Sequence, residues 1–113
     1  MNTQRILLAA ALLLAAQAAC ADGDAANGEK LFQNGPCTSC HGKDALGTAP
    51  QFPVLAGQYK DYLIQALHEY KNGGRNNPIM KGMAEPLSDQ DIKDLAEYLS
   101  HLPGPLGTLP HGG

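Results

Sequence analysis

The sequence contains no tryptophan, only two phenylalanines and few β-branched residues, and these shortages limit the folds that it can adopt. Because strands are rich in β-branched and aromatic residues, a sheet is not expected and we predict an all-α protein. With so few large aromatic side chains, a domain of roughly 80 ordered residues buries little core of its own and usually needs a staple. After Ala21 the β-branched residues are isolated in the chain: Thr38, Thr48, Val54, Ile64, Ile79, Ile92 and Thr108.

Cysteine is also scarce, but two of the three cysteines stand in an informative order. Cys37 and Cys40 are three residues apart and His41 follows at once, a C-x-x-C-H spacing that is typical of covalent haem attachment. Each thiol can add to one haem vinyl group, and neutral imidazole is a good ligand for iron. The motif therefore predicts one covalently bound haem c with His41 as its proximal ligand, the other ring nitrogen donating to a backbone carbonyl.

Three other uses of the same cysteines remain open at this stage. A structural disulfide within the motif would be small and strained. A thioredoxin-like dithiol would need surrounding strands, which the composition disfavours. A zinc site would need two further ligands at compact spacing, whereas the histidines His68, His101 and His111 are scattered and there is no second cysteine pair.

Residues 1–21 have the pattern of a secretory signal peptide. Arg5 precedes an apolar run of eleven residues, Ile6 to Ala16, and small residues follow. This run is too short to span a bilayer. We expect cleavage after Ala21, with cleavage after Ala18 as the alternative, and export to the periplasm. A lipid anchor on Cys20 is the less favoured alternative, because Gln17 stands where lipoproteins usually carry an apolar residue.

The formal net charge is slightly negative, −3 for the whole sequence, and becomes −4 if residues 1–21 are removed with Arg5. A negative protein disfavours nucleic acid or an anionic membrane as a partner. The charge is compatible with a redox partner protein that carries a basic patch.

Three main helices are predicted, separated by short turns and loops. Asp24 or Asn27 can cap a first helix that Gly35-Pro36 ends, and apolar residues at helical spacing predict a second helix from Gln58 to Asn72. Ser88 and Asp91 form a capping-box-like start of a last helix that reaches Leu102 and stops at Pro103. Residues 42–57 are expected to form a loop, and residues 103–113 a flexible tail rich in proline and glycine.

The link between the second and last helices carries two methionines, Met80 and Met83, in a segment without clear periodicity that we interpret as a loop. A haem with one histidine ligand and no contact with water needs a sixth ligand, and a thioether is a common one. One of these methionines is therefore the expected distal ligand. Arg75, in the turn before them, could reach a haem propionate.

Taken together, these residues resemble class I c-type cytochromes, in particular the small periplasmic kind whose single-haem domains are similar to one half of the dihaem cytochromes. The residues that carry the resemblance are Gly28, Phe32, Cys37 to Gly42, Pro50, Pro78 to Met83, the capped last helix and Tyr98. The match covers about residues 24–102 and implies a cytochrome c fold packed around the haem.

The resemblance implies a role for each of these residues. Cys37 and Cys40 would bind the haem vinyls, His41 would be the proximal ligand and Met80 the distal one, with Met83 as the fallback. Pro50 would not touch the iron itself but would offer the backbone carbonyl that orients His41. The first and last helices would cross near Gly28 and Tyr98.

The sequence therefore predicts a signal peptide (1–21), a cytochrome c domain (22–102) and a tail (103–113). The expected function is that of a monomeric periplasmic single-electron carrier and not of an enzyme, because a haem with both axial positions filled has no open site for a substrate. Two alternatives stay open: a haem-bearing subunit of a larger oxidoreductase, and a haem sensor with a displaceable methionine.

Overall fold

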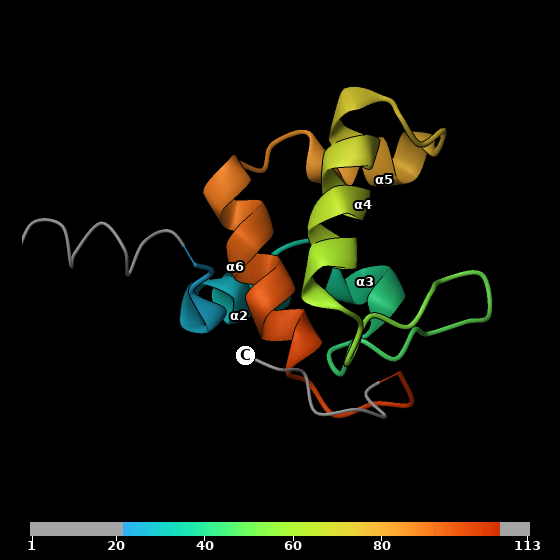
Figure 1. Cartoon of the computed structure of the whole chain (residues 1–113). Helices are drawn as coiled ribbons and strands as arrows, with labels where there is room; N and C mark the ends of the chain where they lie inside the picture. The colour runs from blue at the N-terminus through green and yellow to red at the C-terminus, as the bar shows by residue number, and fades with distance from the viewer. Residues whose placement is uncertain (1–21, 107–113) are drawn as a thin grey trace, which may run out of the picture.

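The computed structural model describes residues 22–106, and within this range the chain forms helices and no strand (Figure 1). The all-α prediction is thus confirmed, while the predicted signal peptide, Cys20 and His111 lie outside the described residues. No helix in this range is both long and apolar enough to cross a membrane. The helices are α2 (Ala25–Asn34), α3 (Thr38–His41), α4 (Lys60–Asn72), α5 (Pro78–Ala84) and α6 (Asp89–Ser100).

Helices α2 and α6 begin where the sequence predicts. The Asp24 carboxylate accepts hydrogen bonds from the backbone N–H groups of Ala26 and Asn27 and so caps α2. Ser88 and Asp91 form a complete capping box at the start of α6. Both caps satisfy backbone donors that a helix start leaves unpaired. Helix α6 ends at Ser100, two residues before the predicted Leu102.

Two predictions for the middle of the chain need correction. Helix α4 begins at Lys60 and not at Gln58, since Tyr59 still has a non-helical backbone. The methionine segment is helix α5 and not a loop. Its start signal is local: Asn77 caps the helix by accepting from the Met80 N–H, and Pro78 occupies the first turn. A helix of seven residues is too short to display an apolar period.

The first and last helices cross where the family resemblance implies. A Cβ atom at Gly28 would lie 2.0 Å from the Asp94 carbonyl oxygen and 2.9 Å from the Tyr98 Cβ, so only glycine allows α2 to approach α6 this closely. The rings of Phe32 and Tyr98 pack beside this crossing with their centroids 6.0 Å apart. The predicted crossing near Gly28 and Tyr98 is confirmed.

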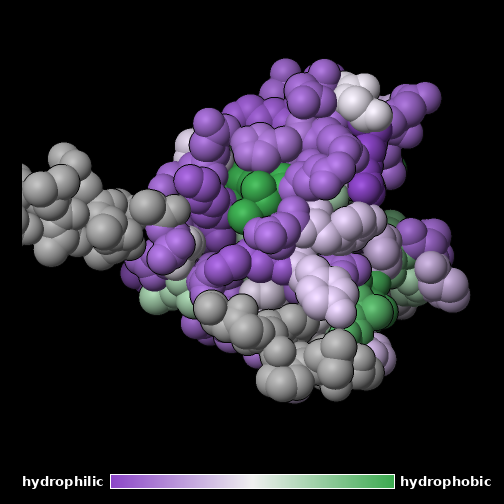
Figure 2. All heavy atoms as spheres, viewed as in Figure 1, coloured by the Kyte–Doolittle hydropathy of each residue, from purple (hydrophilic) through white to green (hydrophobic). Residues whose placement is uncertain are grey.

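The core is small and lies between α2, α4 and α6, as the shortage of aromatic residues predicts. Its large buried members are Phe32, Leu63, Ile92, Leu95 and Leu99, and the remaining buried apolar side chains are alanines. The face of the molecule in Figure 2 is largely hydrophilic, with limited hydrophobic areas reaching the surface. The three helices therefore form a scaffold that needs further apolar material to complete its interior.

A buried carboxylate joins α2 to α6. Asp94 is only 3% exposed, and its two oxygens accept hydrogen bonds from the Asp24 N–H (2.7 Å), the Asn27 amide (2.7 Å) and the Gln90 amide (2.9 Å). Burial opposes ionisation of this carboxyl, but the three hydrogen bonds outweigh it, so the pKa of Asp94 lies below its ordinary value. The ionised form is the one that holds the two helices together.

This linkage predicts how stability depends on pH. Because the folded pKa of Asp94 is depressed, its contribution is complete above the unfolded pKa of about 3.9 and is lost as the pH falls through the folded pKa. In Asp94→Asn the new NH2 group faces one of the three hydrogen-bond donors and cannot accept from it. We therefore expect the free energy of unfolding to fall by about 1–3 kcal/mol at pH 7. Denaturant unfolding of the haem-loaded protein between pH 7 and pH 2 measures both effects.

The exposed carboxylate of Glu29 on the same pair of helices offers the control. Glu29→Gln removes the same charge and should change the free energy of unfolding by less than about 0.5 kcal/mol. The difference in free energy of unfolding between wild type and Asp94→Asn should become smaller as the pH falls. A difference that stays constant down to pH 2 would contradict the conclusion that the ionised carboxylate of Asp94 stabilises the fold.

Candidate haem site

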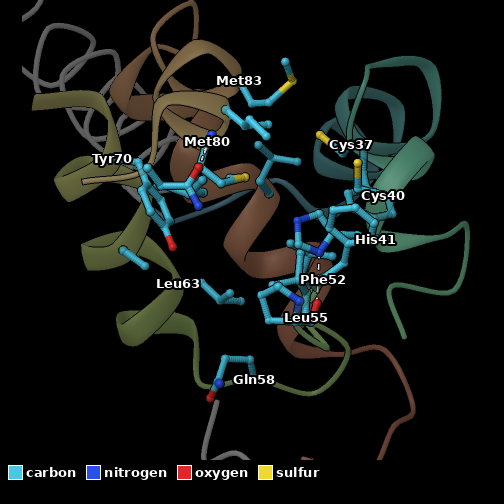
Figure 3. Close-up of a pocket in the computed structure, with 18 of the residues that line it drawn as sticks. Cys37, Cys40, His41, Phe52, Leu55, Gln58, Leu63, Tyr70, Met80 and Met83 are labelled. Atoms are coloured by element: carbon cyan, nitrogen blue, oxygen red, sulfur yellow. Dashed lines mark hydrogen bonds between the residues drawn. The ribbon is translucent and has the colours of Figure 1, made fainter. Parts of the chain in front are cut away.

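A mostly apolar cavity of about 760 Å³ opens beside the core (Figure 3). Its walls come from α2, α3, the loop 42–57, α4, α5 and α6, so segments far apart in the sequence meet around it. A volume of this size lies within the range of about 300–1,000 Å³ that is usual for sites of small molecules and cofactors. Cys37, Cys40, His41, Met80, Met83 and Arg75 all line it.

The cysteine pair and the histidine are brought together by the short helix α3. The N–H groups of Cys40 and His41 both point to the Cys37 carbonyl, so the motif closes one helical turn. Figure 3 shows the two sulfur atoms near one another on one side of the cavity. They are not bonded to each other. The turn thus presents two thiols and one imidazole to a single cavity.

The other interpretations of this motif gain no support. Burial raises the pKa of the Cys37 thiol, although a hydrogen bond from the backbone acts in the opposite direction. Redox-active dithiols have a lowered pKa instead. Among residues 22–106, no three His, Cys, Asp or Glu side chains gather as a zinc site requires. His68 lies near Asp89, and the His101 ring lies 2.8 Å from the Glu97 carbonyl; neither lines the cavity.

His41 is held by a carbonyl, but the residue that supplies it is Pro53 and not Pro50. The His41 Nδ1 lies 2.9 Å from the Pro53 oxygen, which leaves the second ring nitrogen facing the cavity (Figure 3). The prediction for Pro50 is wrong because residues 49–52 form a turn, closed by the Phe52 N–H and the Ala49 carbonyl. Pro50 stands exposed in this turn, and the chain returns to the imidazole only three residues later.

Backbone hydrogen bonds hold the loop that carries Pro53. The buried residue Ala45 accepts hydrogen bonds from Leu55 and Ala56 through one carbonyl oxygen, at 2.8 and 3.1 Å. Gly47 in turn donates to the His41 carbonyl at 2.7 Å. Both the backbone and the ring of His41 are therefore positioned by loop 42–57. The loop has no apolar period, but its backbone hydrogen bonds fix its path and so place the carbonyl that orients His41.

The two methionines of α5 occupy different parts of the cavity. In Figure 3 the Met80 side chain points into the cavity toward the wall that carries His41, whereas Met83 lies farther out. The Met83 side chain is 37% exposed, and Ile79 on the same helix is 66% exposed. A soft thioether and an imidazole nitrogen thus face the same cavity from two sides, a donor set that fits haem iron.

Arg75 is the only formally charged side chain among the described residues that line the cavity. Its Nε lies 2.6 Å from a Glu69 oxygen, and its guanidinium lies 5.3 and 5.5 Å from the ring centroids of Tyr62 and Tyr70. The hydrogen bond to Glu69 is the main cause that raises the pKa of Arg75. The pKa of Glu69 is correspondingly lowered, by hydrogen bonds from Gln65 and Arg75.

This aromatic clamp on Arg75 is absent from the sequence-based site. Tyr62 and Tyr70 belong to the apolar residues whose helical spacing predicts the second helix. Their separation of eight residues places them two turns apart on one face of the helix, and that spacing, followed by an arginine just after the helix end, is the signal that could have indicated the clamp.

Residues 25–103 match the family model described as Cytochrome c. The chain belongs to the cytochrome c family. One relative, cytochrome c-554(548) of Halomonas halodenitrificans, is 46% identical over 81 residues, which cover 69% of this chain and 95% of the relative. Another, the thiosulfate dehydrogenase electron acceptor of Stutzerimonas stutzeri, is 39% identical over 104 residues, covering 85% of this chain and 46% of the relative.

A solved structure of the cytochrome c4 of Acidithiobacillus ferrooxidans has a similar fold. It superposes with a TM-score of 0.68 at 39% identity and covers 72% of this chain and 51% of the other. This cytochrome c therefore corresponds to about half of cytochrome c4, a dihaem protein, as the resemblance implies. Membership in the family means that the cofactor is a covalently bound haem c and that the activity is electron transfer and not enzymatic catalysis.

Proposed function

We propose that the protein is a periplasmic single-electron carrier with one haem c, attached through Cys37 and Cys40 and ligated by His41 and Met80. The observation that carries this proposal is the arrangement around one apolar cavity: two thiols on one side, an imidazole nitrogen facing inward and a thioether directed toward it (Figure 3). A haem bound there supplies the reversible one-electron couple. Met83 is the fallback ligand, disfavoured because it lies toward the surface.

The chain's own residues would keep the chemistry to electron transfer. Pro53 holds the Nδ1 side of the His41 ring, so the other nitrogen keeps a lone pair directed into the cavity. Leu63, Leu95 and Leu99 line the interior and exclude water from it. If His41 and Met80 both hold the iron, no position would be open to a substrate.

Arg75 is the proposed contact for a haem propionate. The guanidinium is oriented by Glu69 and by the two tyrosines, so it need not lose further freedom on binding a carboxylate. Glu69 neutralises part of its charge. We infer that Arg75 both orients the propionate and compensates its charge.

The proposed setting is the periplasm, with export directed by residues 1–21, and the partners are other redox proteins. One relative that matches 85% of this chain is named as an electron acceptor of thiosulfate dehydrogenase. That name makes a periplasmic dehydrogenase a reasonable class of electron donor. The chain spans only about half of this relative and of the cytochrome c4 structure.

The proposal predicts the behaviour of protein exported together with haem-attachment machinery. The haem should remain bound after denaturation, since two thioether bonds hold it, and the iron should undergo one reversible one-electron step. The reduced protein should not bind carbon monoxide rapidly or tightly, because Met80 fills the sixth position. Absorption spectra with a redox titration test these expectations. Rapid, tight binding of carbon monoxide would refute the carrier and favour a haem sensor.

A further inference from the structure

We propose that Lys71 is a positioning residue for Met80, because its ammonium ties the segment that carries Met80 to α4. We call residues 75–87, which include α5, the methionine arm. The inference rests on the proposed function, since it concerns how firmly Met80 is kept as the distal ligand. Lys71 itself does not line the cavity and lies on the last turn of α4.

Apolar packing alone holds the methionine arm weakly. Helix α5 lies beside α4, which is its main helical neighbour (Figure 1). Of the seven residues of α5, only Ala84 is buried in the described part of the chain, while the side chains of Ile79 and Met83 are 66% and 37% exposed. A short helix with one small buried side chain gains little from the hydrophobic effect. The protein's own contacts that fix Met80 must therefore be largely polar.

Polar contacts to the arm come from the last turn of α4. A helix leaves its last four backbone carbonyls without partners inside the helix, and in α4 these belong to residues 69–72. The Glu69 carbonyl accepts a hydrogen bond from the Arg75 N–H at 3.1 Å, where the arm begins. The Lys71 carbonyl lies 3.4 Å from the Lys81 Nζ, in the middle of the arm. The same turn of α4 therefore contacts both the start and the middle of the methionine arm.

The Lys71 side chain holds the end of the arm. Its ammonium donates a hydrogen bond to the backbone carbonyl of Leu87, and this contact is partly buried. Leu87 packs against the core and directly precedes Ser88, the cap of α6. A hydrogen bond from a charged donor is about twice as strong as one between neutral groups. Because the Lys81 contact is long and exposed, the Lys71 hydrogen bond is the strongest of the three ties.

This hydrogen bond should govern how often Met80 leaves the iron. Met80 leaves when the arm opens locally, and the fraction of open molecules falls as the closed arm is stabilised. Carbon monoxide binds reduced iron only while the sixth position is open, so its binding rate reports this fraction. Loss of the Lys71 hydrogen bond should raise the fraction and still leave Met80 bound in most molecules.

The experiment measures the rate at which carbon monoxide binds to the reduced holoprotein. Lys71→Leu keeps an apolar stem and a high helix propensity but removes the donor. We expect this variant to bind carbon monoxide at least about tenfold faster than wild type, which is the effect of losing one hydrogen bond to a charged group. Its spectrum without carbon monoxide should stay low-spin. Lys71→Arg retains a charged donor and should stay within about threefold of the wild-type rate.

Two control variants separate this hydrogen bond from charge and from overall stability. Lys30→Leu makes the same substitution at an exposed lysine of α2 and should leave the rate almost unchanged. Asp94→Asn weakens the link between α2 and α6, but the hydrogen-bond partners of Asp94 lie outside the arm, so the rate should again stay almost unchanged. If Lys71→Leu does not form holoprotein, Lys71→Gln, whose side chain is shorter and uncharged, takes its place with the same expectation.

The outcomes distinguish this inference from the proposed function. A Lys71→Leu protein that binds carbon monoxide at the wild-type rate would overturn the positioning role. An equal acceleration in Asp94→Asn would overturn it too, because overall stability would then explain the effect. If wild type binds slowly and Met80→Ala binds rapidly, the carrier function stands whichever result Lys71 gives. Rapid binding by wild type itself would overturn the carrier function and the inference together.

Discussion

Met80→Ala should convert the haem from a low-spin to a high-spin or water-ligated spectrum and lower the reduction potential. The physical reason is that a thioether stabilises reduced iron, so its loss favours the oxidised state. We expect a fall of on the order of 0.1 V or more, a fraction of the roughly 0.8 V over which axial ligands set haem potentials. Absorption spectra of both oxidation states and a redox titration measure the change.

Met83→Ala is the matched control for this experiment, since it shortens the other methionine of the same helix. Met83 lies three residues farther along α5 and is 37% exposed, so its loss should leave the spectrum low-spin and move the potential only slightly. The reduced Met80→Ala protein should also bind carbon monoxide. If Met83→Ala is instead the damaging change, the fold stands but the distal ligand moves by one helical turn.

Gly28→Ala should destabilise the protein by at least about 3 kcal/mol, because the added methyl cannot fit between α2 and α6. Its Cβ would lie 2.0 Å from the backbone oxygen of Asp94, and a helix backbone cannot give way as the end of a flexible side chain can. Moving the helices apart would also strain the hydrogen bonds that Asp94 accepts from Asp24 and Asn27. Guanidinium unfolding of the holoprotein, followed by circular dichroism, measures the loss.

Gly82→Ala offers the opposite case in the same protein. Gly82 also lies inside a helix, but a Cβ there would meet nothing within 4 Å. Alanine should therefore stabilise the protein by about 0.5–1 kcal/mol, by lowering the entropy of the unfolded chain and raising helix propensity. Equal effects of the two substitutions would show that helix propensity, and not the α2–α6 contact, explains Gly28.

Local signals in the sequence were sufficient for the parts of the fold that depend on near neighbours. The Asp24 cap and the Ser88–Asp91 capping box involve residues two or three apart, so the helix starts could be predicted from residue type and spacing. The haem motif is equally local, since one helical turn joins Cys37 to His41. The methionine helix escaped prediction because its seven residues are too few to show a period.

Contacts across longer distances required the tertiary structure. The family resemblance indicated that a proline carbonyl should orient His41, yet the turn at residues 49–52 decides that it is Pro53 and not Pro50. The clamp of Tyr62 and Tyr70 on Arg75 likewise depends on how the chain turns back after α4.

The sequence by itself determined that the protein is helical, where its first and last helices begin and that it carries a haem motif, because composition and spacing over a few residues govern each of these. Only the tertiary structure decided which carbonyl holds His41 and which methionine points into the cavity. These depend on the path of the backbone between distant residues, and a change of three residues in a loop or one turn in a helix alters them without altering any local pattern.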